Sequence, residues 1–139
     1  MKVLVIDAQG GGLGKQLVAA IKREIPTAYV TAVGTNNTAA MAMLKAGADE
    51  AATGENPVLV ACRKADVIIG PVGIVIADSL LGEITEKMAL AIARSDAKRI
   101  LIPFNQCSNV IVGVPDFSLN TMVLKVIEEV KKTENRLDR

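Results

Sequence analysis

The sequence predicts a three-layer α/β sandwich with a mostly parallel sheet. Three observations predict this class: a continuous apolar run from Val3 to Ile6, a glycine-rich turn from Gly10 to Gly14, and a regular alternation of apolar runs with amphipathic patterns thereafter. Continuous apolar runs are typical of strands buried on both faces of a parallel sheet, and alternating strands and helices build such a sheet with helices on both faces. Glycines directly after a strand let the chain turn with φ > 0 and leave backbone N–H groups at the positive end of the next helix.

The first half of the chain shows strands and helices in strict alternation. After the first strand we expect a helix that ends at Pro26, with the apolar stripe Leu13, Leu17, Val18, Ile21 and Ile25. A strand over Tyr29 to Val33 and a helix over about Thr38 to Lys45, which stops at Gly47, should follow. The next expected elements are a short strand over Ala48 to Thr53 and a helix from Asn56-Pro57 to about Lys64. The asparagines of the turn Gly34 to Asn37 are expected to cap the second of these helices.

The second half continues this alternation until its last strand. The expected elements are strands over Val67 to Gly70, Ile100 to Pro103 and Val110 to Val114, and helices from Thr85 and from the cap Ser118 to Lys132. A parallel connection needs about a dozen residues, and Asn105 to Asn109 offers too few, so the last two strands are expected to be antiparallel or not neighbours. We expect one domain over residues 1–132 and a charged, frayed tail over residues 133–139.

Composition excludes several function classes. The 139 residues carry a net charge of +1 and three aromatic side chains, Tyr29, Phe104 and Phe117, so neither phosphate neutralisation nor base stacking on nucleic acid is favoured. The absence of histidine excludes Ser-His and Cys-His catalysis, and we expect no metal site. No apolar run reaches the roughly 18 residues of a membrane span. Cys62 and Cys107 form no CxxC pair, so we expect a reduced, cytoplasmic setting.

The glycine loop does not match either of the common nucleotide-binding patterns. A G-x-G-x-x-G/A reading that starts at Gly12 ends on Leu17, one that starts at Gly10 ends on Lys15, and Thr35 and Asn36 stand where the ribose-binding acid is expected. In a Walker A reading, Gly14-Lys15 fits, but Gln9 replaces the first glycine and Gln16 the Ser or Thr. We therefore expect a phosphate or nucleotide on this loop without NTP hydrolysis, the alternative being a purely structural turn.

Four turns rich in Gly, Asn or Gln follow the predicted parallel strands, at the edge where ligands bind in such sheets. They predict binding residues at Asp7, Gln9, Gly10, Gly11, Gly12, Gly14, Lys15, Thr35, Asn36, Gly70, Gly73 and Asn105. Several of these side chains have a second interpretation. Asp7 either orients a ribose, metal or water or, as we favour, caps loop N–H groups, and Lys15 either pairs with phosphate or is solvated. Cys107 is more readily a structural than a reactive cysteine, and Glu83 and Glu86 more readily decorate a helix start than act as an acid/base pair.

Several segments together resemble a known family. VIDAQGGGLGKQL, KAGADEAATGEN, ADVIIGPVGI, LLGEIT and ILIPFNQC are similar to those of a family of short bacterial Rossmann-like proteins of unknown function. The resemblance spans nearly the whole chain. It implies a Rossmann-like domain and a bacterial cytoplasmic setting, and it implies no activity.

Three function classes remain. The first is a module that binds a nucleotide, a dinucleotide or another small anionic ligand. The second is an enzyme acting on a small phosphorylated or carboxylated metabolite. The third is an assembly protein without a ligand. We also expect a homodimer, because the apolar run from Pro71 to Leu81 carries more apolar surface than one helix face packed against a sheet would bury.

Overall fold

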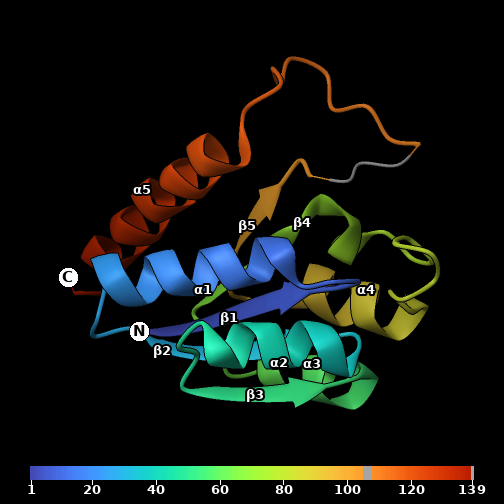
Figure 1. Cartoon of the computed structure of the whole chain (residues 1–139), viewed down its shortest axis with the longest axis horizontal. Helices are drawn as coiled ribbons and strands as arrows, with labels where there is room; N and C mark the ends of the chain where they lie inside the picture. Colours follow the sequence, from blue (N-terminus) through green and yellow to red (C-terminus); the bar gives the residue numbers. More distant parts are fainter. Residues whose placement is uncertain (105–107, 139) are drawn as a thin grey trace.

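The computed structural model describes residues 1–104 and 108–138 of the chain (Figure 1). Within them lie five strands: β1 (Lys2–Asp7), β2 (Tyr29–Gly34), β3 (Glu50–Thr53), β4 (Val67–Pro71) and β5 (Lys98–Ile102). The same residues hold the helices α1 (Gly12–Glu24), α2 (Asn37–Lys45), α3 (Glu55–Cys62), α4 (Glu86–Arg94) and α5 (Leu119–Leu137) and a short 3-10 helix, η1 (Val72–Val75).

The five strands form one parallel sheet in the order β3-β2-β1-β4-β5. This is the Rossmann order, in which the chain winds outward from β1 in one direction and then from β4 in the other. The predicted three parallel strands over Val3–Ile6, Val67–Gly70 and Ile100–Pro103 are confirmed. β1 thus lies at the centre of the sheet, with β2 and β4 on either side of it.

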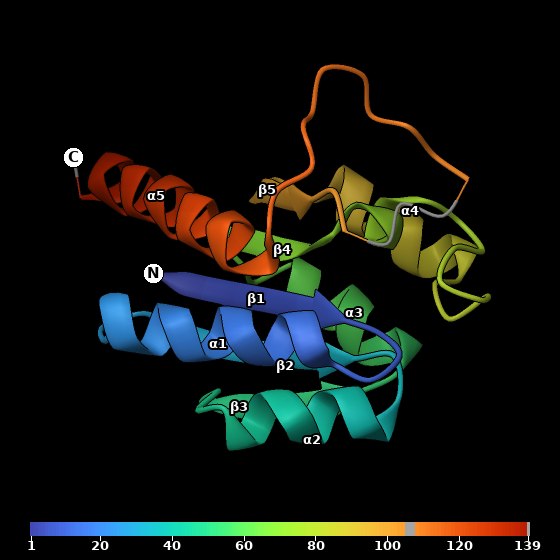
Figure 2. The ribbon, with the colours of Figure 1, turned by 45° about the horizontal axis from the view of Figure 1, so that its top comes forward.

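Helices cover both faces of the sheet and give it three layers (Figures 1 and 2). One core contains alternate residues of β1, among them Val3 and Val5, packed under α1, α2 and α5. The other contains Leu4 and Ile6 packed under α3 and α4. Because successive side chains of a strand point to opposite faces, the apolar run of β1 feeds both cores, which explains why it is continuous rather than alternating.

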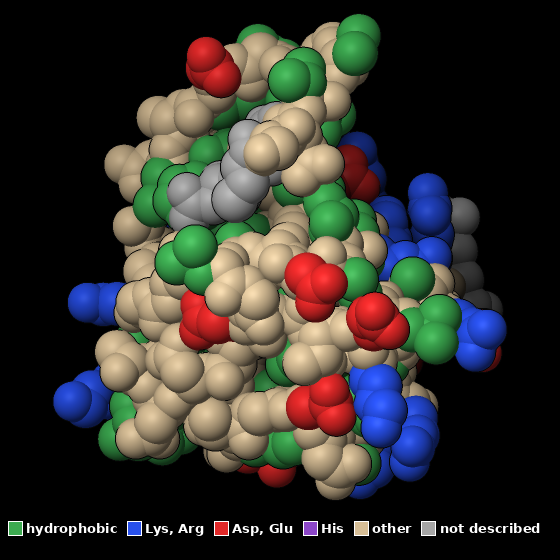
Figure 3. Space-filling view, turned by 90° about the vertical axis from the view of Figure 1, so that its right-hand side faces the viewer, with side chains coloured by type: hydrophobic (Ala, Val, Ile, Leu, Met, Phe, Trp, Pro, Cys, Tyr) green, Lys and Arg blue, Asp and Glu red, His purple; other side chains and the backbone are tan. Residues whose placement is uncertain are grey.

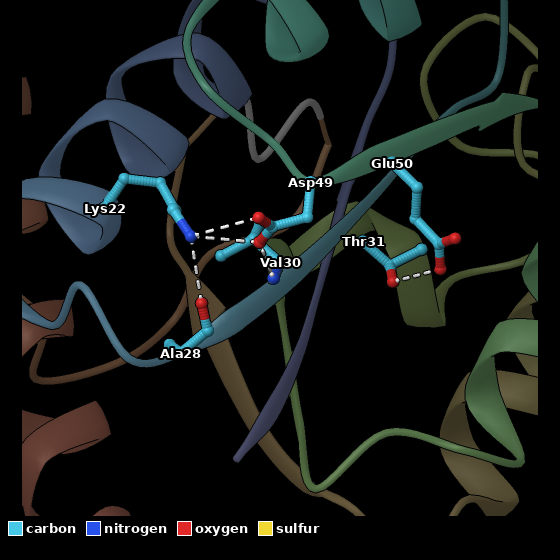
Figure 4. Close-up of polar contacts among 6 residues, drawn as sticks. All are labelled: Lys22, Ala28, Val30, Thr31, Asp49 and Glu50. Atoms are coloured by element: carbon cyan, nitrogen blue, oxygen red, sulfur yellow. Dashed lines mark hydrogen bonds and ion pairs between the residues drawn. The ribbon is translucent and has the colours of Figure 1, made fainter.

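Polar contacts stabilise the amino ends of β2 and β3, at the end of the sheet opposite to the glycine loop (Figure 4). The Asp49 carboxylate accepts from the Val30 backbone N–H at 2.7 Å and pairs with Lys22 Nζ at 3.0 Å. Lys22 Nζ also donates to the Ala28 carbonyl at 3.1 Å. The end of α1 is therefore joined to the beginnings of β2 and β3. The Val30 N–H, followed by Lys22, lowers the pKa of Asp49 below its ordinary value.

The strand predicted over Val110–Val114 is wrong. These residues form no strand, and Val114 N–H donates instead to the Ile111 carbonyl at 3.3 Å, across a turn in which Gly113 has φ 85°. A left-handed residue inside the segment breaks the extended backbone that a strand needs. Residues 108–118 instead extend away from the sheet, and the chain comes back to the sheet at α5 (Figure 2). The sheet is accordingly all parallel over the described residues.

Other element boundaries also differ from expectation. α3 begins one residue before Asn56, with Gly54 rather than Asn56 as its cap. α5 continues through the expected tail to Leu137, because Thr133 is buried and its hydroxyl donates to the Glu129 carbonyl at 3.0 Å. The caps Asn36, Thr85 and Ser118 are where the sequence predicts them.

Replacing Asp49 with asparagine should lower the free energy of unfolding at pH 7 by about 1–2 kcal/mol, because a charged acceptor of two donors is lost at a partly exposed site. Since the pKa of folded Asp49 lies below the ordinary value of 3.8, its contribution is present above that pH and is lost as the pH falls through the folded pKa. Urea unfolding at pH 7 and pH 3 measures both effects. Glu50→Gln is the control, since it removes the charge of the next carboxylate along the chain, which accepts from the Thr31 hydroxyl, and leaves the Asp49 contacts in place. Equal losses in the two variants would contradict this role of Asp49.

Candidate functional site

The candidate site lies at the carboxyl ends of β1 and β4, where the direction of winding reverses. A pocket of about 220 Å³ opens there. Its walls are residues 7–13 with Gln16, Pro71, Leu80, Phe104 and Leu119. Ligands of open α/β sheets bind in the crevice at this point of the topology. The pocket is smaller than the roughly 300–1,000 Å³ that encloses a drug-sized molecule, so it fits one part of a ligand whose remainder lies outside.

The glycines of the loop divide into packed and open positions. Gly11 has φ 73°, and a Cβ there would lie 2.8 Å from the Ala39 Cα. A Cβ on Gly14 would lie 2.6 Å from Met43 Sδ and 2.9 Å from Asp7 Cβ, so this glycine lets α1 approach α2 and β1. A Cβ on Gly10 or Gly12 would meet nothing within 4 Å. The last two glycines therefore face open space beside the pocket.

Asp7 ends β1 with its carboxylate against the start of α1. Its Oδ2 accepts from the Gly14 N–H at 2.6 Å, and its Oδ1 accepts from the Ala8 N–H at 2.8 Å. Asp7 thus makes the contacts of a cap for loop N–H groups. Burial raises the pKa of this carboxyl, the N–H groups of Gly14 and Ala8 oppose that shift, and the negative charge of Glu83 adds to it.

Asp7 leaves other donors of the helix terminus unused. The first N–H groups of a helix have no acceptor inside the helix. Among the described residues, the N–H groups of Gly10, Gly12 and Leu13 have no hydrogen-bond acceptor, whereas Gly11 donates to the Ala8 carbonyl at 3.1 Å. These three residues also line the pocket. Unused donors and open space therefore coincide.

A second group of polar side chains lies on the β2 side of the loop. The Glu83 carboxylate, carried by the connection between η1 and α4, accepts from the Thr35 hydroxyl at 2.9 Å, from Asn36 Nδ2 at 2.7 Å and from the Gln9 N–H at 3.0 Å. Asn36 Nδ2 also donates to the Gln9 carbonyl at 2.9 Å, while its Oδ1 caps α2 by accepting from the Ala39 N–H at 2.9 Å. The predicted residues Gln9, Thr35 and Asn36 are thus brought together by Glu83.

Four predicted residues fall outside this arrangement. Lys15 is exposed on α1, and the neighbouring Gln16 lines the pocket in its place. Gly70 and Gly73 do not line the pocket and serve close packing, since a Cβ on Gly70 would lie 2.6 Å from the Ile6 carbonyl oxygen and one on Gly73 3.1 Å from Ser79 Oγ. Asn105 lies outside the described residues, as does Cys107.

Sequence reasoning missed Glu83 as a member of the site. It had assigned this residue to the start of a helix, and no local pattern links it to Gln9, 74 positions earlier. It also missed Leu80, Phe104 and Leu119 as pocket walls. For Phe104 a signal existed, because it directly follows a predicted strand.

The face that carries the site is acidic at its centre. Figure 3 looks onto the side of the molecule toward which β1 runs, where acidic side chains stand across the middle and Lys and Arg lie toward the margins. Asp7 and Glu83 are the carboxylates that bond to the loop. The positive counterpart there is the helix terminus, with its partial charge.

Two other features do not form a comparable site. A larger pocket, of about 540 Å³, lies between α3 and the β2–β3 part of the sheet, and alanines and aliphatic side chains make up most of its wall. It reaches Lys2 and Tyr29, the first residues of β1 and β2, and so lies away from the carboxyl ends of the strands, where ligands of such sheets bind. Cys62 is buried among apolar residues, which raises the pKa of its thiol to about 11 and leaves it unreactive at neutral pH. Within residues 1–104 and 108–138, no cluster of three His, Cys, Asp or Glu side chains is placed to hold a metal ion.

Comparisons with known proteins agree with the expected family relation. Residues 2–135 match the family model described as Domain of unknown function (DUF3842). No curated protein sequence matches the chain. Among solved structures, it is similar to a dodecameric FMN-dependent UbiX-like decarboxylase from Escherichia coli O157:H7, with 19% identity and a TM-score of 0.45 over 96% of this chain and 76% of that one. None of the helices in the described part of the chain has the length and apolar character of a membrane span.

The pKa of Asp7 gives a pH-dependent prediction. Asp7→Asn should destabilise the protein by about 1–3 kcal/mol near pH 4, because the amide NH2 of asparagine would face one of the two N–H groups that donate to Asp7. Since burial raises the folded pKa above 3.8, ionised Asp7 costs stability in the wild type, and the advantage of the wild type over the variant should shrink as the pH rises through that folded pKa. Urea unfolding from pH 4 to 8 measures the difference. Asp78→Asn, which removes an exposed carboxylate, is the control. An advantage that grows with pH would overturn the assignment.

Proposed function

The chain belongs to this family of unknown function, and we propose that it binds a small phosphorylated molecule, a mononucleotide or a related phosphate ester, with the phosphate on the glycine loop. The observation that carries the proposal is the coincidence of unused N–H groups on Gly10, Gly12 and Leu13 with the pocket at the switch point of the sheet. Backbone N–H groups at a helix terminus bind phosphate through both hydrogen bonds and the helix dipole.

The open positions of the loop support close approach of a phosphate. With no Cβ on Gly10 or Gly12 and no neighbouring atom within 4 Å of where one would be, an oxyanion can reach the backbone. The packed glycines Gly11 and Gly14 hold the loop in shape without the ligand. Such a preformed site loses little entropy on binding, which favours affinity.

Charge narrows the class of ligand. Asp7 already occupies one donor of the helix terminus, and Glu83 adds a second negative charge beside the loop. Several adjacent phosphates would meet repulsion from both carboxylates, and exposed Lys15 stands apart from the pocket. A monophosphate ester suits these charges better than a triphosphate. The buried free thiol of Cys62 is compatible with the reduced cytoplasmic compartment that we propose.

Binding rather than catalysis is the primary proposal. Of the described residues that line the pocket, Asp7 alone carries an ionisable side chain, and its carboxylate already bonds to two N–H groups. An enzyme acting on a phosphorylated metabolite remains the alternative. Turnover of a bound ligand would separate the two.

Self-association is a second proposal, and a specific feature of the surface favours it. Val110 and Val112 are 85% and 92% exposed in the segment that stands away from the sheet. Of the apolar run from Pro71 to Leu81, which first suggested a dimer, Ile74 and Leu80 are buried within the chain, whereas Leu81 is 93% exposed. Two exposed valines, one residue apart on a protruding segment, suit burial against a second copy.

Replacing Gly12 with valine tests the phosphate site. The side chain would enter the space where the ligand lies, so binding should be abolished while the free energy of unfolding changes by no more than about 0.5 kcal/mol, because a Cβ at Gly12 meets nothing. Calorimetric titration with AMP and with ribose 5-phosphate measures binding. If the variant bound as tightly as the parent, the loop would be structural and the site would lie elsewhere.

Gly14→Ala is the matched control for this experiment. Its Cβ would crowd Met43 and Asp7, so this variant should lose about 1–3 kcal/mol of stability. The contrast separates a glycine kept open for a ligand from one required for packing.

The oligomer proposal predicts that the parent chain is a dimer at micromolar concentration and that Val110→Ser with Val112→Ser makes it a monomer. Light scattering measures the mass. Leu124→Ser, which removes an apolar side chain 62% exposed on α5, should leave the dimer intact. A monomeric parent chain would refute the proposal.

A further inference from the structure

We infer that the carboxylate of Glu83 accepts from a hydroxyl of a vicinal diol on the sugar of the phosphorylated ligand, as a ribonucleotide carries. This inference rests on the proposed function, because it assigns the sugar of the ligand whose phosphate binds the glycine loop. It is carried by the position of Glu83, which reaches the end of β2 from a distant part of the chain.

The position is the one where this topology needs an acid. In dinucleotide-binding domains with this strand order, a carboxylate after the second strand accepts hydrogen bonds from the ribose. Here Thr35 and Asn36 follow that strand, and by sequence the acid is missing. In the folded chain Glu83 Oε1 lies 2.9 Å from Thr35 Oγ1 and 2.7 Å from Asn36 Nδ2. The carboxylate therefore occupies the expected place although it comes from a different connection.

Glu83 also lies beside the proposed phosphate site. Its Oε2 accepts from the N–H of Gln9, the residue before Gly10, at 3.0 Å. The carboxylate stands at the β2 flank of the loop and the 220 Å³ pocket at the flank toward β4. A phosphate on the loop would thus have an acceptor for hydroxyls on one side and a partly apolar recess on the other.

The carboxylate retains capacity to accept hydrogen bonds. An ionised carboxylate has about four acceptor positions. Oε1 accepts from Thr35 and Asn36, and the Gln9 N–H, the only donor to Oε2 among the described residues, lies 3.0 Å from Oε2 and 3.3 Å from Oε1, so that one acceptor position of Oε2 remains open. Glu83 is half-buried, and no Lys or Arg of the described residues pairs with it. A carboxylate without a cation, surrounded by neutral donors, selects hydroxyl donors and repels a second phosphate.

The connection that carries Glu83 borders both flanks of the loop. Leu80 lines the pocket, and Glu83, three residues later, bonds to Gln9. Between them the backbone is left-handed at Leu80, Leu81 and Gly82, with φ of 56°, 59° and 80°. Left-handed non-glycine residues cost energy and persist where their surroundings fix them. A structural latch, in which Glu83 only fixes the connection to the loop, would not make the affinity for a ligand depend on its diol. The dependence of affinity on the diol therefore distinguishes the two roles.

The first experiment compares two nucleotides on the unmodified protein. AMP and 2′,3′-dideoxyadenosine 5′-monophosphate share base and phosphate and differ in the hydroxyls that Glu83 would bind. Calorimetric titration should give a Kd for AMP lower by roughly tenfold or more, the range of a hydrogen bond to a charged acceptor. Equal affinities would overturn the inference and leave the phosphate site standing. Absence of binding by either nucleotide would overturn both proposals.

The second experiment assigns the selectivity to Glu83. Glu83→Gln should weaken AMP by roughly tenfold and leave the dideoxy nucleotide almost unchanged, so that selectivity disappears. Glu86→Gln is the matched control, because Glu86 is exposed at the start of α4 and lies outside the contacts of the loop. That variant should keep the full preference for AMP. If Glu83→Gln weakened both nucleotides by the same factor, Glu83 would be a latch and not a receptor for hydroxyls. Thermal melts of both variants report their folding.

Discussion

The contact between the Asp7 carboxylate and the Gly14 N–H is the constraint on which the geometry of the site depends. It joins the last residue of the central strand to the first turn of α1 at 2.6 Å. The contact requires a glycine, because any Cβ at residue 14 would overlap Asp7 and Met43. With α1 held there, the N–H groups of Gly10, Gly12 and Leu13 remain at the opening of the pocket. The same carboxylate sets a limit, since its negative charge, when Asp7 is ionised, leaves less of the helix dipole for a ligand.

The fold was largely predictable because its signals are local. Each signal predicts the element within a few residues of it. The apolar run predicts β1, the glycines after it predict the start of α1, and Asn36 and Thr85 predict the starts of α2 and α4, and all of these elements form where expected. The loop of the candidate site was predictable for the same reason. The failed strand at Val110–Val114 shows the limit of composition, because β-branched residues make a strand only where the backbone can stay extended, and the left-handed Gly113 prevents this.

Glu83 could not have been found in this way. Its partners Gln9 and Thr35 are separated from it by 74 and 48 positions, and the connection that brings it to them consists of turns with left-handed residues. No period of hydrophobicity describes such a connection. Lys15 is exposed and does not line the pocket, since a position next to a glycine loop does not determine which side of the helix a residue occupies. One residue further along, Gln16 faces the pocket.

The central place of β1 has a consequence for how the chain folds during synthesis. β1 is made first, yet it pairs on one side with β4, whose Val67 to Ile69 meet Val3 to Val5. At about 5–20 residues per second, a ribosome would need on the order of 3–13 s to add the intervening stretch. For that interval one side of β1, whose residues Val3 to Ile6 are all apolar, has no partner strand. Contacts of such long sequence separation slow folding, and an unpaired apolar edge invites pairing with other chains. A chaperone that shields the nascent segment would therefore act on β1 before any other part of the sheet.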